Sequence, residues 1–119
     1  MYNGNAKGKD WRPYAKHILL CMDKIRRIQA KGDIQKDDIL YDACLRNLQT
    51  LSEATQLLPD ALKHQFDEIP WRDISGFRNI LVHNYLGTID PMTVQGVIDR
   101  HLPKLEDAVK QMLLVSDGC

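Results

Sequence analysis

The positions of the prolines constrain this chain most, because proline can begin or end a helix but breaks the hydrogen-bond ladder inside one. Four of the five prolines stand where a helix could begin or end: Pro13, Pro59, Pro70 and Pro91. Between them apolar residues recur at helical spacing, and no Asn-Gly or Asp-Gly turn separates alternating apolar and polar runs. The sequence therefore predicts an all-α fold.

Start and stop signals define four helices. Asp10 and Asp90 can act as N-caps, and Gly32 can end the first helix. Pro103 lies inside the last helical pattern and should kink or split it. The short connections favour an antiparallel up-down four-helix bundle with a short extra helix and a kinked last helix. The predicted helices span roughly residues 10–31, 37–58, 70–87 and 90–115, and the short extra helix spans roughly 59–66.

The apolar stripes of the first two helices predict the core. Cys21 and Cys44 occupy apolar helical positions and should be buried. With Cys119 they make an odd count without metal-ligand spacing, which indicates reduced thiols in a cytoplasmic protein. The other expected core residues are Tyr14, Ile18, Ile25 and Ile28 in the first helix, and Ile39, Ala43, Leu48, Leu51, Ala54 and Leu58 in the second.

The length and the charge of the chain limit the number of domains and the kinds of partner that it can have. The chain of 119 residues suffices for one modest core, and we expect a disordered tail at residues 1–9 and a single domain over 10–119. The 16 basic and 16 acidic residues balance, so DNA binding is not expected and any RNA contact needs a local patch. No apolar run is long enough to cross a bilayer, which argues against a membrane protein.

The most polar stretch of the third predicted helix reads R-N-x-x-x-H-x-Y, from Arg78 to Tyr85. On a helical wheel, Ile74, Phe77 and Leu81 share the core face, whereas Arg72, Gly76, Asn79 and His83 share an edge nearly opposite. Arg78 and Tyr85 are almost superimposed beside the core face. Gly76 would let a ligand or another backbone approach that edge, and Ile80 is a candidate for burial against a second chain.

This set of side chains suits phosphodiester cleavage. The imidazole of His83 can exchange a proton at neutral pH. The guanidinium of Arg78 can hold a phosphate through two hydrogen bonds, and Asn79 can orient either group. With RNA the substrate's own 2′-hydroxyl can be the nucleophile, and no metal-ligand spacing occurs in the sequence, so neither metal nor cofactor is expected. The alternative is structural: an exposed polar face or an interhelical hydrogen-bond network, with Tyr85 at the edge of the core and Trp71 as a core or staple residue.

With Ile69-Pro70-Trp71-Arg72-Asp73-Ile74 ahead of it, the motif resembles the HepT-like branch of the HEPN superfamily, the higher-eukaryote and prokaryote nucleotide-binding domains. Residues 43–54 resemble that branch's R-N-L and I-G-E-A pattern, and residues 101–105 its D-L-P-x-L pattern. Ser52 replaces a glycine of the pattern, and His101 stands where aspartate is common.

The resemblance implies a helical homodimer in which the motifs of both subunits line a cleft. It implies a metal-independent RNase toxin of a type VII-like toxin–antitoxin pair, with tRNA or mRNA as substrate. Carried over, Arg78 and His83 become the catalytic pair and Asn79 a supporting residue. Tyr85 becomes the site where a nucleotidyltransferase antitoxin attaches AMP.

Two other functions compete with this one. A non-catalytic HEPN subunit could bind a nucleotide or act through its nucleotidyltransferase partner, which the zero net charge favours slightly. Alternatively, the motif could serve only a dimer interface, in which case replacing Arg78 would change the oligomeric state and no activity.

Overall fold

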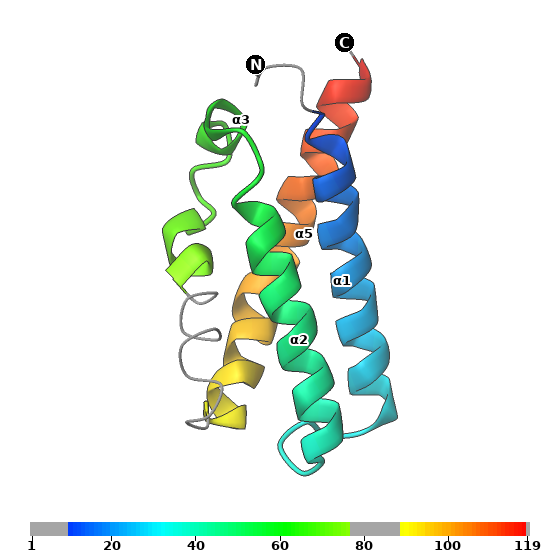
Figure 1. Cartoon of the computed structure of the whole chain (residues 1–119). Helices are drawn as coiled ribbons and strands as arrows, with labels where there is room; N and C mark the ends of the chain where they lie inside the picture. Colours follow the sequence, from blue (N-terminus) through cyan, green and yellow to red (C-terminus); the bar gives the residue numbers. More distant parts are fainter. Residues whose placement is uncertain (1–9, 77–88, 119) are drawn as a thin grey trace.

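In the computed structural model, the structure describes residues 10–76 and 89–118, and these residues form helices and connections without any strand. The helices are α1 (Arg12–Lys31), α2 (Asp38–Thr55), α3 (Asp60–His64) and α5 (Pro91–Gly118), together with one helical stretch at residues 71–76. In Figure 1, α1 and α2 run antiparallel, and α5 runs antiparallel to α1 along the same bundle. The predicted all-α, up-down bundle is confirmed, whereas the predicted tail at 1–9 lies outside the described residues.

Aspartate side chains mark the starts of the three long helices. Asp37 caps α2 by accepting hydrogen bonds from the backbone N–H groups of Ile39 and Leu40 at 3.0 and 3.2 Å. Asp10 accepts one from Arg12 at 3.0 Å, and Asp90 accepts one from Met92 at 3.3 Å. Each contact satisfies a donor that the first turn of a helix would otherwise leave unpaired.

Two boundaries differ from the sequence-based expectation. Helix α2 ends at Thr55, about one turn early, where the hydroxyl of Thr55 donates to the carbonyl of Ser52 at 2.6 Å and that of Ser52 donates to Leu48 at 2.8 Å. Helix α5 continues through Pro103, so the predicted split is wrong. Pro103 is exposed, and proline removes one backbone N–H from the helix at this position.

The core lies where α1, α2 and α5 meet, and its side chains come from all three helices. Cys21 and Cys44 are buried, as predicted, and burial raises the pKa of the Cys44 thiol to about 11. Ile39 was expected in the core but is 75% exposed, whereas Leu40, the next residue of α2, packs against the core. Within the described part of the chain, no helix is long and apolar enough to cross a membrane.

One ion pair joins the outer faces of α1 and α5. The guanidinium of Arg26 donates to both carboxylate oxygens of Glu106, at 2.7 Å for the Nη1–Oε2 contact. This contact lowers the pKa of Glu106 and raises that of Arg26. It links two residues that are 80 positions apart in the chain.

Candidate active site

The residues that the sequence singles out, Arg78, Asn79, His83 and Tyr85, all belong to residues 77–88, outside the described part of the chain. The structure does describe the helical residues 71–76 that lead into them, and Ile89 and Asp90 that follow them. What holds the two flanking stretches in place can therefore be derived from the fold.

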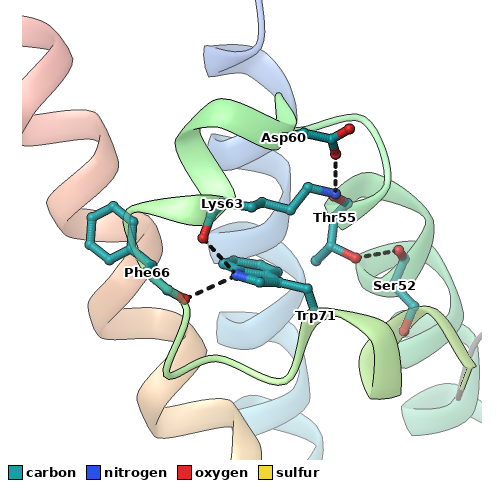
Figure 2. Close-up of polar contacts among 6 residues, drawn as sticks. All are labelled: Ser52, Thr55, Asp60, Lys63, Phe66 and Trp71. Atoms are coloured by element: carbon teal, nitrogen blue, oxygen red, sulfur yellow. Dashed lines mark hydrogen bonds and ion pairs between the residues drawn. The ribbon is translucent and has the colours of Figure 1, made fainter.

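Trp71 anchors the beginning of the 71–76 helix (Figure 2). Its indole N–H donates to the backbone carbonyls of Phe66 and Lys63, at 3.0 and 3.2 Å. Ahead of it, Ile69 is buried, and the helix begins with a hydrogen bond from the Ile74 N–H to the Pro70 carbonyl at 3.0 Å. Trp71 also packs against the core, which confirms its predicted role as a core or staple residue.

Lys63 closes the same cluster from the side of α3. Its ammonium donates to the carbonyl of Thr55 at 3.1 Å, lies 3.9 Å from the carboxylate of Asp60, and stands 6.0 Å from the centre of the Trp71 ring. A cation is favourable at this place, because the last carbonyls of α2 carry partial negative charge and the indole face is electron-rich. The cluster thus joins the end of α2, α3 and the start of the 71–76 helix.

Tyr41 holds the other flanking stretch. Its hydroxyl donates to the backbone carbonyl of Ile89, which links α2 to the residue just before the Asp90 cap of α5. Burial raises the pKa of the Tyr41 phenol, and the nearby carboxylates of Asp42 and Asp90 raise it further. The phenol therefore stays protonated and keeps donating at neutral pH.

A cavity of about 510 Å³ opens between α2, residues 70–76 and α5. Three polar side chains reach it: Arg72 and Asp73, both exposed, and His101, which is half-buried. The apolar lining consists of Leu48, Leu51, Pro70, Ile74, Val97, Leu102 and Leu105, with Gly76 between them. Among the described residues, no group of three His, Cys, Asp or Glu side chains is placed to hold a metal ion.

Residues 71–76, the described part of the helix that leads into the motif, agree with the helical wheel in two respects. Ile74 packs against the core, as the core face of the wheel predicts. Arg72 and Gly76, the first two residues of the opposite edge, both line the cavity. Within the described part of the chain, a β-carbon added at Gly76 would meet no atom within 4 Å apart from its own helix backbone and its chain neighbours.

Sequence reasoning missed three residues of this region. His101 was noted only as a departure from the family pattern, and it lines the cavity. Tyr41 and Lys63 were not singled out, although they secure the stretches on either side of residues 77–88. The hydrogen-bond partner of Tyr41 lies 48 residues away in the chain, so no local spacing could have revealed it.

The sequence matches the family described as Ribonuclease HepT-like over residues 18–112, and the chain belongs to that family. A protein of Caldanaerobacter subterraneus subsp. tengcongensis named as a candidate RNase is 34% identical over 105 residues, which cover 86% of this chain and 93% of the relative.

Two further relatives come from archaea. A Methanocaldococcus jannaschii protein, named as a gamma-glutamylcyclotransferase and candidate RNase, is 27% identical over 88% of this chain, which spans 48% of that longer protein. A Thermococcus cleftensis protein named as a candidate ribonuclease HepT is 29% identical over 64% of this chain and 73% of its own length. No solved structure matches the chain significantly.

Proposed function

We propose that this protein is a metal-independent endoribonuclease whose catalytic pair is Arg78 and His83. Family membership supports the RNase activity, since relatives covering most of this chain carry RNase names. The observation that carries the site is the placement of Arg72 and Gly76 on the cavity. On the helical wheel Asn79 and His83 share their edge, which would bring the imidazole to the same side of the helix.

The proposed reaction needs no group beyond the protein and RNA. His83 accepts the proton of a ribose 2′-hydroxyl, whose oxygen attacks the adjacent phosphorus. Arg78 binds the phosphate and stabilises the charge that grows on its oxygens, while Asn79 orients these groups. The bond to the 5′-oxygen of the next nucleotide breaks, and that oxygen takes up a proton. The products are a 2′,3′-cyclic phosphate and a 5′-hydroxyl end.

We further propose that the enzyme acts in the cytoplasm as a homodimeric toxin on tRNA or mRNA. A nucleotidyltransferase antitoxin would neutralise it by attaching AMP to Tyr85. Tyr85 and Arg78 are nearly superimposed on the wheel, so the added phosphate would occupy the place where Arg78 holds substrate phosphate. AMP-modified protein should therefore cleave RNA much more slowly than unmodified protein, and equal rates would contradict this mode of inhibition.

The test is cleavage of a total tRNA pool by purified protein with EDTA present. The wild type should leave 2′,3′-cyclic phosphate ends, and His83→Ala and Arg78→Ala should lose the activity. His64→Ala is the matched control, because His64 is exposed on α3 and does not belong to the motif sequence. Retained cleavage in folded His83→Ala protein would overturn the catalytic assignment.

The main alternative is a non-catalytic subunit that binds a nucleotide or acts through its nucleotidyltransferase partner, and the balanced charge of the chain favours it. No cleavage by folded, unmodified wild-type protein, together with tight binding of the partner, would support that alternative. A motif that serves only dimerisation predicts a different result for the Arg78→Ala variant. Arg78→Ala would then shift the elution volume in size-exclusion chromatography and change no activity.

A further inference from the structure

We propose that the cavity between α2, residues 70–76 and α5 binds one nucleoside unit of single-stranded RNA, with the base against its apolar walls and the neighbouring phosphate at Arg72. The inference rests on the proposed ribonuclease function and adds to it a substrate-binding subsite. Its volume of about 510 Å³ falls within the range of roughly 300–1,000 Å³ that is usual for small-molecule sites.

The walls of the cavity suit a flat ring. Pro70 and Ile74 on one side and Val97 on α5 on the other are each partly exposed, so a ring between them would bury apolar surface. Below them, Leu48 and Leu105 are almost completely buried and form a packed floor. RNA-binding proteins take up unpaired bases in this way, since every base has an apolar face whatever its sequence.

The polar side chains at the rim complement the rest of a nucleotide. Arg72 is exposed and can pair with a phosphate through its guanidinium fork. His101, on α5, lies half-buried in the lining and can stack on a base or hydrogen bond with its edge. Asp73 supplies an acceptor for a base N–H or a ribose hydroxyl. The cavity thus provides a donor, an acceptor and a cation around an apolar slot.

Gly76 leaves the space that such a ligand would need. Among the described lining residues it alone lacks a side chain, and no described atom outside its own helix and its chain neighbours lies within 4 Å of the position of its missing β-carbon. A β-carbon added at this position therefore has room among the described residues. Gly76 is a place where a side chain can be added to fill the cavity.

A second copy of the chain is the other occupant to consider. The large apolar side chains that are most exposed on the described surface do not line the cavity, and they would be the natural contacts of an apolar interface. They are Leu20, Ile39, Leu57, Met92, Leu114 and Val115. A hollow with a cation and an imidazole at its rim suits a nucleotide better than it suits a flat apolar partner.

The first test measures binding separately from cleavage. The probe is a fluorescent 2′-O-methyl oligoribonucleotide of about eight nucleotides, whose blocked 2′-oxygen prevents the attack. Gly76→Leu should weaken binding roughly tenfold or more by fluorescence anisotropy, as expected for the loss of a stacked base. Gly76→Ala adds only one carbon atom, so its affinity for the probe should be closer to that of the wild type than the affinity of Gly76→Leu is. Gly96→Leu is the matched control on α5, where the atoms nearest to an added β-carbon belong to the flexible side chain of Arg100.

The second test concerns the phosphate and does not depend on filling the cavity. Arg72→Gln should weaken binding and reduce the slope of log Kd against log salt by about 0.7, the value for one phosphate contact on a single strand. Arg27→Gln is the control, because Arg27 is exposed on α1 and pairs with Asp23. Free AMP and CMP, added as competitors, distinguish a site for any nucleotide from one that requires an RNA strand.

The outcomes separate this inference from the proposed function. Wild-type binding by folded Gly76→Leu protein, or no binding by the wild type, would overturn the cavity assignment and leave the His83→Ala cleavage test unaffected. A change of oligomeric state in Gly76→Leu without a change in RNA affinity would assign the cavity to a second copy and also overturn the inference. Weakened binding by Gly76→Leu and Arg72→Gln, with both controls unchanged, would establish the subsite even if His83 proved dispensable for cleavage.

Discussion

Lys63 and Trp71 contact each other twice: the indole N–H of Trp71 donates to the backbone carbonyl of Lys63 at 3.2 Å, while the Lys63 ammonium lies 6.0 Å from the centre of the indole ring. The same ammonium bonds to the carbonyl of Thr55 at 3.1 Å. The pair therefore connects the end of α2, the short helix α3 and the first turn of the helix that leads to the sequence motif. A five-residue helix such as α3 could not hold this geometry alone, because short helices are marginal in water.

Trp71→Phe should lower the free energy of unfolding by at least about 1 kcal/mol, because the carbonyls of Phe66 and Lys63 lose their shared donor and the phenyl ring is smaller than the indole. Trp71→Ala should cost about 3 kcal/mol, since the ring is lost as well. Urea denaturation followed by circular dichroism measures both. Trp11→Phe is the control, because Trp11 also packs against the core. Equal stability of Trp71→Phe and the wild type would show that the indole hydrogen bonds contribute nothing.

Tyr41→Phe should lower the free energy of unfolding by about 1 kcal/mol, because it removes only the hydroxyl that donates to the Ile89 carbonyl. The effect should also appear locally, as faster hydrogen exchange of amides at the start of α5. Tyr14→Phe provides the comparison, since Tyr14 likewise packs against the core from α1. Uniformly faster exchange along α1, α2 and α5 would indicate a global loss of stability and would contradict a local link.

The Arg26–Glu106 ion pair predicts that the stability of the fold depends on pH in the acidic range. Because Arg26 lowers the pKa of Glu106 in the folded state, the pair stabilises the fold above the ordinary glutamate pKa, and this contribution is lost as pH falls through the folded-state pKa. Glu106→Gln should cost at most about 1 kcal/mol at pH 7, since Arg26 is half-exposed. The difference from the wild type should vanish in strong acid, as thermal melts across pH would show. The exposed Glu68 provides the control variant Glu68→Gln, and a constant difference at all pH values would refute the ion-pair origin.

The buried thiol of Cys44 predicts a pH dependence of the opposite sign: the stability of the fold should decrease as pH rises in the alkaline range. Its pKa is raised to about 11 by burial, so the folded state favours the protonated thiol. Its contribution to stability is fully present below the thiol's ordinary pKa and is lost as pH rises from there towards 11. The wild type should therefore lose stability more steeply than Cys44→Ala between these values, whatever the cost of the substitution at pH 7. Parallel stability curves for the two proteins would contradict the assignment.

Predictions from the sequence were correct where the spacing pattern lies within a single helix. The cap Asp90, the buried Cys21 and Cys44, and the edge shared by Arg72 and Gly76 all follow from local spacing. It failed for Ile39, whose spacing fits the core stripe of α2 but which is 75% exposed, whereas its neighbour Leu40 packs against the core. Residues 77–88, which contain Arg78, Asn79, His83 and Tyr85, lie outside the described residues, so their assignment stays a proposal.

By itself, the sequence determined the helices, their order and the motif that identifies the family, because proline placement, capping and helical periodicity act over a few residues. Only the tertiary structure decided which distant groups meet. It brings Tyr41 to Ile89, Arg26 to Glu106, and His101 of α5 to the cavity that Arg72 and Gly76 also line. Such contacts depend on how helices pack and cross, and many packings satisfy the same apolar stripes. The neighbours of a polar side chain are therefore a property of the assembled bundle.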